Sequence, residues 1–383
     1  MVASTATLPN VSPTDNAAEY SQRLAAAAVS ATEHGVDVLF ISPGPDLTYL
    51  TGYDAIPLER LTCLVLPSEG DPCLVVPTLE EAAAAASPIS AMQLPVHSWP
   101  ETADPFELVA SLTPAAAKTA AVDDRMWASK ALALQAALPN TRLVAAGEVM
   151  TELRMRKSAR EIAALQEAGE AIDDVHRLVP ELLRPGRTER EVAADISDAI
   201  LRGHARVDFV IVASGPNGAS PHHESSDRVL EVGDAIVVDI GGTTAAGYCS
   251  DSTRTYHLGQ PDPEYAAAFE VLHQAQQEAT AAAVVGARCE AVDAAARDRL
   301  TEAGLGELFI HRTGHGIGLE THEEPYIVEG NTLPLEPGMA FSIEPGFYDA
   351  GRWGARIEDI VVCSADGPIV CNNTDRSLHI VDC

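Results

Sequence analysis

One apolar, strand-like passage occurs twice in this chain, and each copy begins with a glycine and ends in an acid six residues later. The copies are Gly233-Asp-Ala-Ile-Val-Val-Asp239 and Gly338-Met-Ala-Phe-Ser-Ile-Glu344. An internal repeat of this kind predicts two similar units that pack about a pseudo-twofold axis, with equivalent positions face to face. We therefore expect Asp239 and Glu344 to lie close together.

Each copy is followed by a second strand-like stretch that carries another acid. These stretches are residues 248–256, with Asp251, and residues 356–362, with Glu358. Because side chains alternate between the faces of a strand, Arg356 and Glu358 should project to the same face. Burying four carboxylates at strand ends costs several kcal/mol per charge unless something neutralises them. The two hairpins therefore predict a site for one or two cations.

Helices repeat before each hairpin in the same order, with a glycine break between them. In the first half, Pro185-Gly186 ends one helix, and Thr188-Glu-Arg-Glu191 has the pattern of a capping box that starts the next. The ranges expected to be helical are 158–183, 188–202, 263–284 and 289–303. Each half therefore contains two helices, a strand and a hairpin, which predicts an α+β domain.

The region before this repeat alternates helices and strands. The expected strands are residues 36–41, 61–67 and 73–77, and the expected helices are residues 17–34, 79–86 and 129–137. This order predicts an α/β domain. A loop is expected through Pro43-Gly44-Pro45, and residues 45–53, taken alone, are compatible with a strand and a turn.

These patterns divide the chain into three parts. Residues 1–16 are polar and rich in Ala, Ser, Thr and Pro, which predicts a flexible tail. The α/β domain is expected over residues 17–147, and the α+β domain over residues 148–383. A helix over residues 148–157 should link the two. A chain of 383 residues is long enough for two such cores.

Charge and cysteine usage exclude several classes of partner. The net charge of -31 argues against nucleic acid and anionic membranes, because each phosphate contact needs a Lys or Arg. No apolar run reaches the roughly 18 to 20 residues of a membrane span, and the N-terminus lacks the basic and apolar parts of a signal peptide. The seven cysteines are scattered without a Cys-x-x-Cys pair. This pattern predicts a reduced, cytoplasmic protein with no nucleic-acid or membrane partner.

A turn-rich segment between the hairpins, His311-Arg-Thr-Gly-His315, offers the imidazole that often completes a carboxylate site. One imidazole and four carboxylates, with no thiolate, suit divalent manganese or cobalt, with zinc a weaker match. Two ions about 3.5 to 4 Å apart would lower the pKa of a bridging water and clamp the oxygens of a hydrolytic transition state. Hydrolysis is the natural expectation.

With these motifs the sequence resembles the metallopeptidase family of methionine aminopeptidases, aminopeptidase P and prolidase, whose catalytic domain has the pita-bread fold. The resemblance covers roughly residue 148 to the C-terminus. It implies that Asp239 chelates one metal, that His315 and Glu344 hold the other, and that Asp251 and Glu358 bridge the two. The matching motifs are Val-Val-Asp239-Ile-Gly-Gly, Ser-Asp251-Ser-Thr-Arg-Thr, Gly-His315-Gly-Ile-Gly-Leu, Ser-Ile-Glu344-Pro-Gly and Arg356-Ile-Glu358-Asp.

A second resemblance lies in the first domain. Pro45-Asp-Leu-Thr-Tyr-Leu-Thr-Gly-Tyr53 is similar to the creatinase-type domain that precedes the catalytic domain in prolidases and aminopeptidase P. Methionine aminopeptidases lack that domain. Proline-specific members also carry an arginine at the position of Arg356, beside the last ligand. Together these features imply Xaa-Pro substrates.

The resemblance also implies roles for three histidines. His222, in Ser220-Pro-His222-His223, matches a residue that contacts substrate and assists proton transfer, whereas His223 is a neighbour. His322 matches the residue that stabilises the developing oxyanion, and His311 matches one that lines the proline pocket.

The implied mechanism is attack by a metal-bridging hydroxide on the carbonyl carbon before proline, with Glu344 as proton acceptor and donor. Arg356 remains protonated, so it suits orienting carboxylates or the charged end of the substrate. The expected substrate is therefore a small Xaa-Pro peptide.

Four alternatives bear on function. Compact length favours a dipeptidase over an aminopeptidase P acting on longer peptides. A creatinase-like C–N hydrolase and a non-catalytic pita-bread binding module both fit less well, because such relatives lose metal ligands and this chain keeps all five. The family resemblance further implies a homodimer.

Overall fold

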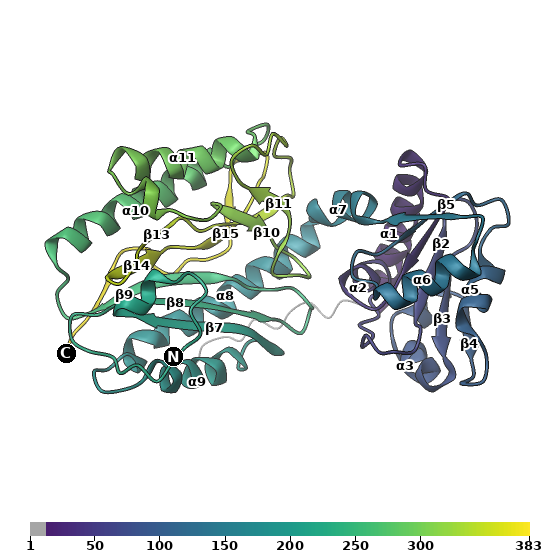
Figure 1. Ribbon diagram of the computed structural model, residues 1–383, viewed down its shortest axis with the longest axis horizontal. Helices are drawn as coiled ribbons and strands as arrows, with labels where there is room; N and C mark the ends of the chain where they lie inside the picture. The colour runs from purple at the N-terminus through teal and green to yellow at the C-terminus, as the bar shows by residue number, and fades with distance from the viewer. Residues whose placement is uncertain (1–12) are drawn as a thin grey trace. The chain divides into compact units, whose positions relative to one another are not determined.

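This computed structural model describes residues 13–383, and it divides the chain into two compact units between Arg154 and Met155 (Figure 1). The sequence placed the domain boundary at residues 147/148. Helix α7 (Gly147–Met155) accounts for the difference, because Met150 is buried and the Tyr49 hydroxyl donates to the Leu153 carbonyl at 3.2 Å.

Residues 1–12 of the expected tail lie outside the described residues. Residues 13–16 already belong to α1 (Pro13–Glu33), so the helix begins earlier than its expected start at residue 17.

The first unit is built on a six-stranded mixed sheet with the order β4-β3-β2-β1-β5-β6. Its strands are β1 (Val38–Ile41), β2 (Cys63–Pro67), β3 (Cys73–Pro77), β4 (Val96–Trp99), β5 (Thr119–Val122) and β6 (Arg142–Ala145). Its remaining helices are α2 (Pro45–Thr51), η1 (Thr78–Glu80), α3 (Glu81–Ala86), α4 (Ile89–Met92), α5 (Pro105–Leu112) and α6 (Ala128–Ala137). The core lies between this sheet and its helices, around residues such as Phe40, Val65 and Leu134. The α/β expectation is confirmed.

The reading of residues 45–53 as a strand and turn is wrong, because Pro45 begins helix α2. Proline suits the first position of a helix, where its missing N–H would have no partner. Gly52 ends the helix in the left-handed conformation, with a φ of 68°, and its N–H donates to the Thr48 carbonyl at 2.8 Å.

The second unit contains two helix pairs and three sheets. The helices are α8 (Ala159–Leu182), α9 (Glu189–Ile200), α10 (Pro263–Ala282) and α11 (Cys289–Glu302), with short turns η2 (Gly215–Ala219) and η3 (Gly306–Leu308). All four long helices lie within a few residues of their expected bounds. The capping box at Thr188 and Glu191 is confirmed, and Ser158 and Glu161 form another at the start of α8.

One sheet of this unit has the order β17-β9-β8-β7, a second has the order β11-β10-β12-β15-β16, and a third pairs β13 with β14. Figure 1 shows α8 and α9 on one side of the sheets, with α10 and α11 on the opposite side. The strands are β7 (Arg206–Ser214), β8 (Ala235–Thr243), β9 (Ser252–Leu258), β10 (Gly314–Gly316), β11 (Glu323–Ile327), β12 (Ala340–Ile343), β13 (Gly346–Asp349), β14 (Trp353–Arg356), β15 (Asp359–Val362), β16 (Ile369–Val370) and β17 (His379–Val381).

The first hairpin, β8 with β9, forms as expected, and Asp239 stands opposite Thr253. The second hairpin differs, because the stretch 356–362 is not one strand. Strand β14 pairs with β13, whereas β15 pairs with β12. Glu358 lies between them and its N–H donates to the Thr253 carbonyl at 3.1 Å. The chain therefore changes partners at Glu358, and this bridge joins the two halves at the acids.

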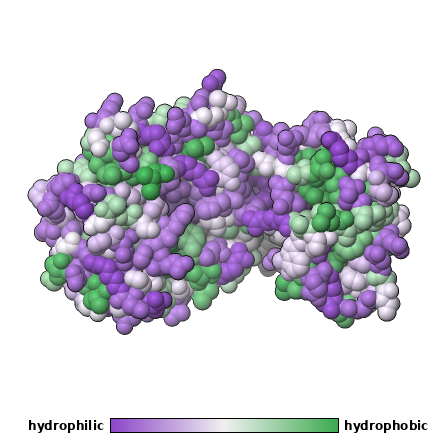
Figure 2. Space-filling view, in the orientation of Figure 1, coloured by the Kyte–Doolittle hydropathy of each residue, from purple (hydrophilic) through white to green (hydrophobic). Residues whose placement is uncertain are grey.

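None of the helices in the described part of the chain has the length and apolar character of a membrane span. In each unit, the face drawn in Figure 2 is mostly hydrophilic with small apolar patches, which agrees with the strongly acidic composition.

Candidate metal centre

Five expected ligands converge in the second unit from different elements. The sheet of the first hairpin supplies Asp239 on β8 and Asp251 just before β9. His315 lies on β10, Glu344 directly follows β12, and Glu358 lies between β14 and β15. Four of these residues are buried and Glu344 is half-buried.

The ligand atoms form overlapping groups, within each of which they lie within 4.8 Å of one another. One group is Asp239, Asp251 and Glu358, and another is His315, Glu344 and Glu358. Glu358 belongs to both. Asp251 also groups with His315 and His322. Two acids therefore lie between the other ligands, where carboxylates that bridge two ions would be needed.

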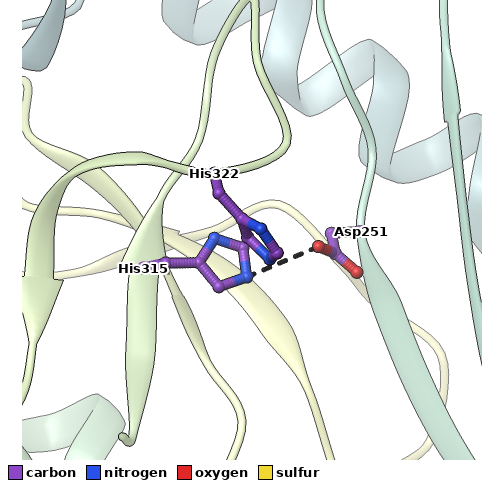
Figure 3. Close-up of side chains that lie close together, drawn as sticks. All are labelled: Asp251, His315 and His322. Atoms are coloured by element: carbon purple, nitrogen blue, oxygen red, sulfur yellow. Dashed lines mark ion pairs between the residues drawn. The ribbon is translucent and has the colours of Figure 1, made fainter. Parts of the chain in front are cut away.

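Proton positions on His315 leave a lone pair directed at the acids. Nδ1 donates to the Gly316 carbonyl at 3.1 Å, so Nε2 carries no proton in the neutral ring. Nε2 lies 3.3 Å from Oε1 of Glu344. It also lies 3.6 Å from Oδ2 of Asp251, the pair marked in Figure 3. Burial, and then His322, lowers the pKa of His315 to about 3. A cation between the neutral imidazole and the two carboxylates would accept the lone pair of Nε2 and offset the negative charges.

The acids repel one another in the absence of a cation. Burial, followed by the charge of Glu358, raises the pKa of Asp251 well above its usual range. The pKa of Glu358 rises in the same way through burial and then Glu344. Burial raises the pKa of Glu344 to about 7, although Arg356 opposes the rise. A bound cation would allow these carboxyl groups to ionise together.

Asp239 supplies the most specific sign of a missing partner. Its Oδ2 accepts from Nη2 of Arg356 at 2.5 Å. Its Oδ1 is buried and makes no hydrogen bond within the described residues. Buried carboxylate oxygens are almost always satisfied. The residues present therefore fit a bound divalent ion.

Arg356 is buried and its donors are directed at protein groups. Nε donates to the Thr253 hydroxyl at 3.1 Å, and that hydroxyl donates to Oε2 of Glu358 at 2.7 Å. The expected shared face of Arg356 and Glu358 is thus confirmed, while Ile357 between them lies in the core. These contacts support the orientation of carboxylates by Arg356.

A directional chain of hydrogen bonds runs from Arg356 to His311. Nη1 of Arg356 donates to the Tyr348 hydroxyl at 2.8 Å, and Tyr348 lies 2.8 Å from Nε2 of His311. Nδ1 of His311 donates to the Arg312 carbonyl at 2.7 Å, so Nε2 accepts from Tyr348. Burial, and then Arg356, lowers the pKa of His311 to about 4. Sequence reasoning missed Tyr348, because its pattern is that of any aromatic strand residue.

His322 and His222 lie on the open side of the cluster, and both are exposed. The rings of His322 and His315 meet edge to face, with centroids 4.0 Å apart (Figure 3). Burial, then Arg312 and His222, lowers the pKa of His322. His222 also contributes to the lowered pKa of His311. The two histidines therefore lie where a substrate in solution can reach them.

His223 faces a different group. Its Nε2 lies 2.8 Å from Oε2 of Glu189. Glu189 is fully buried and also accepts hydrogen bonds from Ser214, Asn217 and Ser226. This carboxylate fixes both ends of the segment that carries His222. The sequence did not identify Glu189 beyond its place in the first turn of α9.

Arg312 is a second residue that sequence reasoning missed, although it lies between His311 and His315. Its guanidinium lies over the Tyr326 ring, 4.2 Å from the centroid. Within the described part of the chain, no side-chain hydrogen bond or ion pair of Arg312 is found. Its positive charge helps to lower the pKa of His322, and it opposes the rise in the pKa of Glu344.

Comparison with known proteins assigns both units. Residues 163–365 match metallopeptidase family M24, and residues 23–156 match the creatinase/prolidase N-terminal domain. The chain is 54% identical to a probable dipeptidase PepE from Mycobacterium tuberculosis, over 94% of this chain and 96% of that protein. It is 36% identical to an Xaa-Pro dipeptidase from Lactobacillus helveticus, over 90% and 95%.

Solved structures show the same fold. The dipeptidase PepE from Mycobacterium ulcerans superposes with a TM-score of 0.92 at 54% identity, covering 96% of this chain and 99% of that one. Both the creatinase-like N-terminal domain and the pita-bread catalytic domain expected from the motifs are thereby confirmed.

Proposed function

This chain belongs to metallopeptidase family M24, and we propose that it is a metal-dependent dipeptidase that cleaves the peptide bond before proline. The observation that carries the proposal is the set of overlapping groups formed by the five ligand residues, in which Oδ1 of Asp239 is buried and makes no hydrogen bond within the described residues. The Xaa-Pro dipeptidase among the relatives supports the substrate class.

Two divalent ions would be held by the five grouped ligands. We assign Asp239 to one ion, His315 and Glu344 to the other, and Asp251 and Glu358 to both. Carboxylate and imidazole donors without thiolates favour manganese, with cobalt or zinc as substitutes. When bound, such ions supply a nucleophilic water at neutral pH and positive charge beside the scissile carbonyl.

The protein's own residues move protons and orient the substrate. We assign to Glu344 the acceptance of a proton and its later return, because its carboxylate lies beside His315 within the ligand cluster. His322 can donate to the oxygen of the tetrahedral species, because its ring is exposed beside His315. We assign His222 to delivery of a proton to the leaving proline nitrogen, and His311 to the wall of the proline pocket.

A dipeptidase must recognise the carboxylate of the proline itself. Burying that carboxylate without a cation would cost several kcal/mol. The donors of Arg356 are directed at Asp239, Thr253 and Tyr348, which supports a positioning role. We therefore assign recognition of the substrate carboxylate to Arg312, whose guanidinium has no acceptor in the described structure.

The cellular setting belongs to the same proposal. All seven cysteines are free, which supports a reducing, cytoplasmic compartment. The homodimer and the pseudo-twofold relation between the halves also remain proposals. Sedimentation of the purified protein would test the first of these.

Two other functions use the same fold. An Xaa-Pro aminopeptidase would share the metal chemistry but accept longer peptides. A non-catalytic pita-bread binding module would need no ligands, so the complete set argues against it.

A peptide panel tests the proposal. The manganese-loaded protein should cleave Ala-Pro, Met-Pro and Leu-Pro in preference to tripeptides that extend them after proline. Preference for the tripeptides would favour an aminopeptidase, and absence of cleavage across the panel would contradict the proposal.

A further inference from the structure

A buried ion pair lies beside the catalytic cluster without belonging to it. Nζ of Lys157 contacts Oε1 of Glu323, and their side chains are 1% and 9% exposed. Lysine is scarce in this chain, which has it only at residues 118, 130 and 157. Burying both charges carries a desolvation cost, and apolar residues in place of such a pair are often neutral or stabilising. Stability alone therefore does not account for this pair.

Glu323 directly follows His322 and begins strand β11. In the sheet it stands opposite Gly316, the neighbour of His315. Fixing the Glu323 side chain therefore fixes the backbone next to His322 and its position relative to the ligand His315.

Lys157 is fixed in turn by the strand that leads to Glu344. Its N–H donates to the Gly338 carbonyl at 2.8 Å. Gly338 has a φ of 90°, and a Cβ there would lie 2.7 Å from the Lys157 carbonyl oxygen. The close backbone contact thus requires glycine at the start of the second repeated passage. Lys157 connects that passage to the segment carrying His322.

The turn after His315 packs directly on the pair. A Cβ at Gly318 would lie 2.8 Å from Oε1 of Glu323 and 3.1 Å from Cε of Lys157. The Gly318 carbonyl accepts from the Cys249 N–H at 2.9 Å, two residues before Asp251. The pair therefore packs against the turn at Gly318, and a hydrogen bond from the segment that leads to Asp251 holds that turn.

We propose that the Lys157–Glu323 pair is a positioning element that holds His322 against the metal cluster. This inference rests on the proposed role of His322 in peptide hydrolysis. The contacts of the pair described above run to Gly318 and to the backbone next to His322, so the pair acts on His322 through the backbone of residues 318–323. It explains the presence of a buried lysine and the glycine at residue 318 together.

Glu323→Gln is the principal test, because it removes the charge with little change in shape. It should lower kcat for Leu-Pro roughly ten- to a hundredfold, the scale of a misplaced catalytic group, with KM nearly unchanged and metal content equal to wild type. Lys157→Met paired with Glu323→Leu keeps the test valid if the single variants fold poorly, since it removes both charges of the pair together. It should show the same loss of kcat.

A neighbouring ion pair gives the matched control. Arg156, next to Lys157, pairs with Glu336, two residues before the second repeated passage, but their side chains are 39% and 42% exposed. Glu336→Gln should leave kcat within about twofold of wild type, as expected for an exposed pair.

A double-mutant cycle separates positioning from general structural support. If the pair acts through His322, Glu323→Gln should cause almost no further loss of kcat in a His322→Ala background. Equal losses in both backgrounds, or wild-type kcat in Glu323→Gln, would overturn the inference. The crystal structure of Glu323→Gln gives a readout independent of activity: a displaced His322 supports the inference, and an unmoved His322 overturns it. Failure of the wild type to cleave any Xaa-Pro peptide would instead contradict the proposed function.

Discussion

Arg356 and Asp239 lie 117 residues apart in sequence and are joined by a hydrogen bond of 2.5 Å from Nη2 to Oδ2. The arginine fixes one oxygen of the carboxylate, while the other, Oδ1, is buried without a hydrogen bond in the described structure. The Asp239 carboxylate is therefore fixed in place with one oxygen left to bind a ligand, whereas both oxygens of a purely structural carboxylate would be hydrogen-bonded within the protein.

Hydrolysis should depend on bound metal. Chelation should abolish cleavage of Leu-Pro, and manganese or cobalt should restore it, because the grouped carboxylates and the free lone pair of His315 are suited to hold divalent ions. Asp251→Asn or Glu358→Gln should lose at least one ion per chain when metal content is measured. Full activity in metal-free protein would contradict this prediction.

His322→Ala should lower kcat by roughly 10²-fold or more, the scale of losing one oxyanion donor. Metal content should stay at the wild-type level. The structure makes this a sharp test, because the ligand atoms of His322, His315 and Asp251 lie within 4.8 Å of one another. Loss of metal in the variant would show that His322 is a ligand.

Substitution of His222 and of His223 should lower kcat to different extents. His222→Ala should lower kcat on the same scale as His322→Ala, because its side chain is exposed beside the cluster. His223→Ala should be milder in kcat, since His223 contacts Glu189. Measuring kcat for both variants decides the matter, and the reverse order would place the catalytic role on His223.

Stability should depend on pH through Glu189. Burial alone would raise its pKa, but hydrogen bonds from Ser226 and Ser214 outweigh burial and lower the pKa to about 2. A depressed pKa stabilises the fold above the unfolded value near 4.5, and that contribution disappears as pH falls towards 2. Glu189→Gln should therefore lower the free energy of unfolding at pH 7 by about 2–3 kcal/mol.

Urea unfolding of wild type and Glu189→Gln at several pH values measures this difference. The gap between the two proteins should shrink between pH 4.5 and 2. A constant difference in the free energy of unfolding across that range would show that ionised Glu189 does not stabilise the segment that carries His222.

The ligand set could be predicted because acids at strand ends stand out in an apolar sequence. Asp239 and Glu344 close matching passages, and Arg356 and Glu358 both contact the Thr253 hydroxyl, as their expected shared face implied, although the strand breaks between them. Helices α8 to α11 could also be predicted from the sequence, since their amphipathic patterns and the breaks between them are local features.

Other features depend on contacts that no local pattern contains. The exchange of strand partners at Glu358 requires Thr253, more than a hundred residues earlier. The helix at Pro45 was missed because a short segment with Pro and Gly at its ends fits a turn as well as a capped helix. The roles of Tyr348, Glu189 and Arg312 follow only from what surrounds them in space.

The ratio of kcat/KM for Leu-Pro to that for Leu-Pro-amide, measured with manganese, tests the central claim most directly. Amidation removes the carboxylate that we assign to Arg312 while leaving the scissile bond intact. The account predicts a ratio of at least about 10, equivalent to roughly 1.4 kcal/mol, and a ratio close to 1 in Arg312→Met. Equal or better cleavage of the amide by the wild-type protein would contradict a dipeptidase and indicate an aminopeptidase with the same metal chemistry.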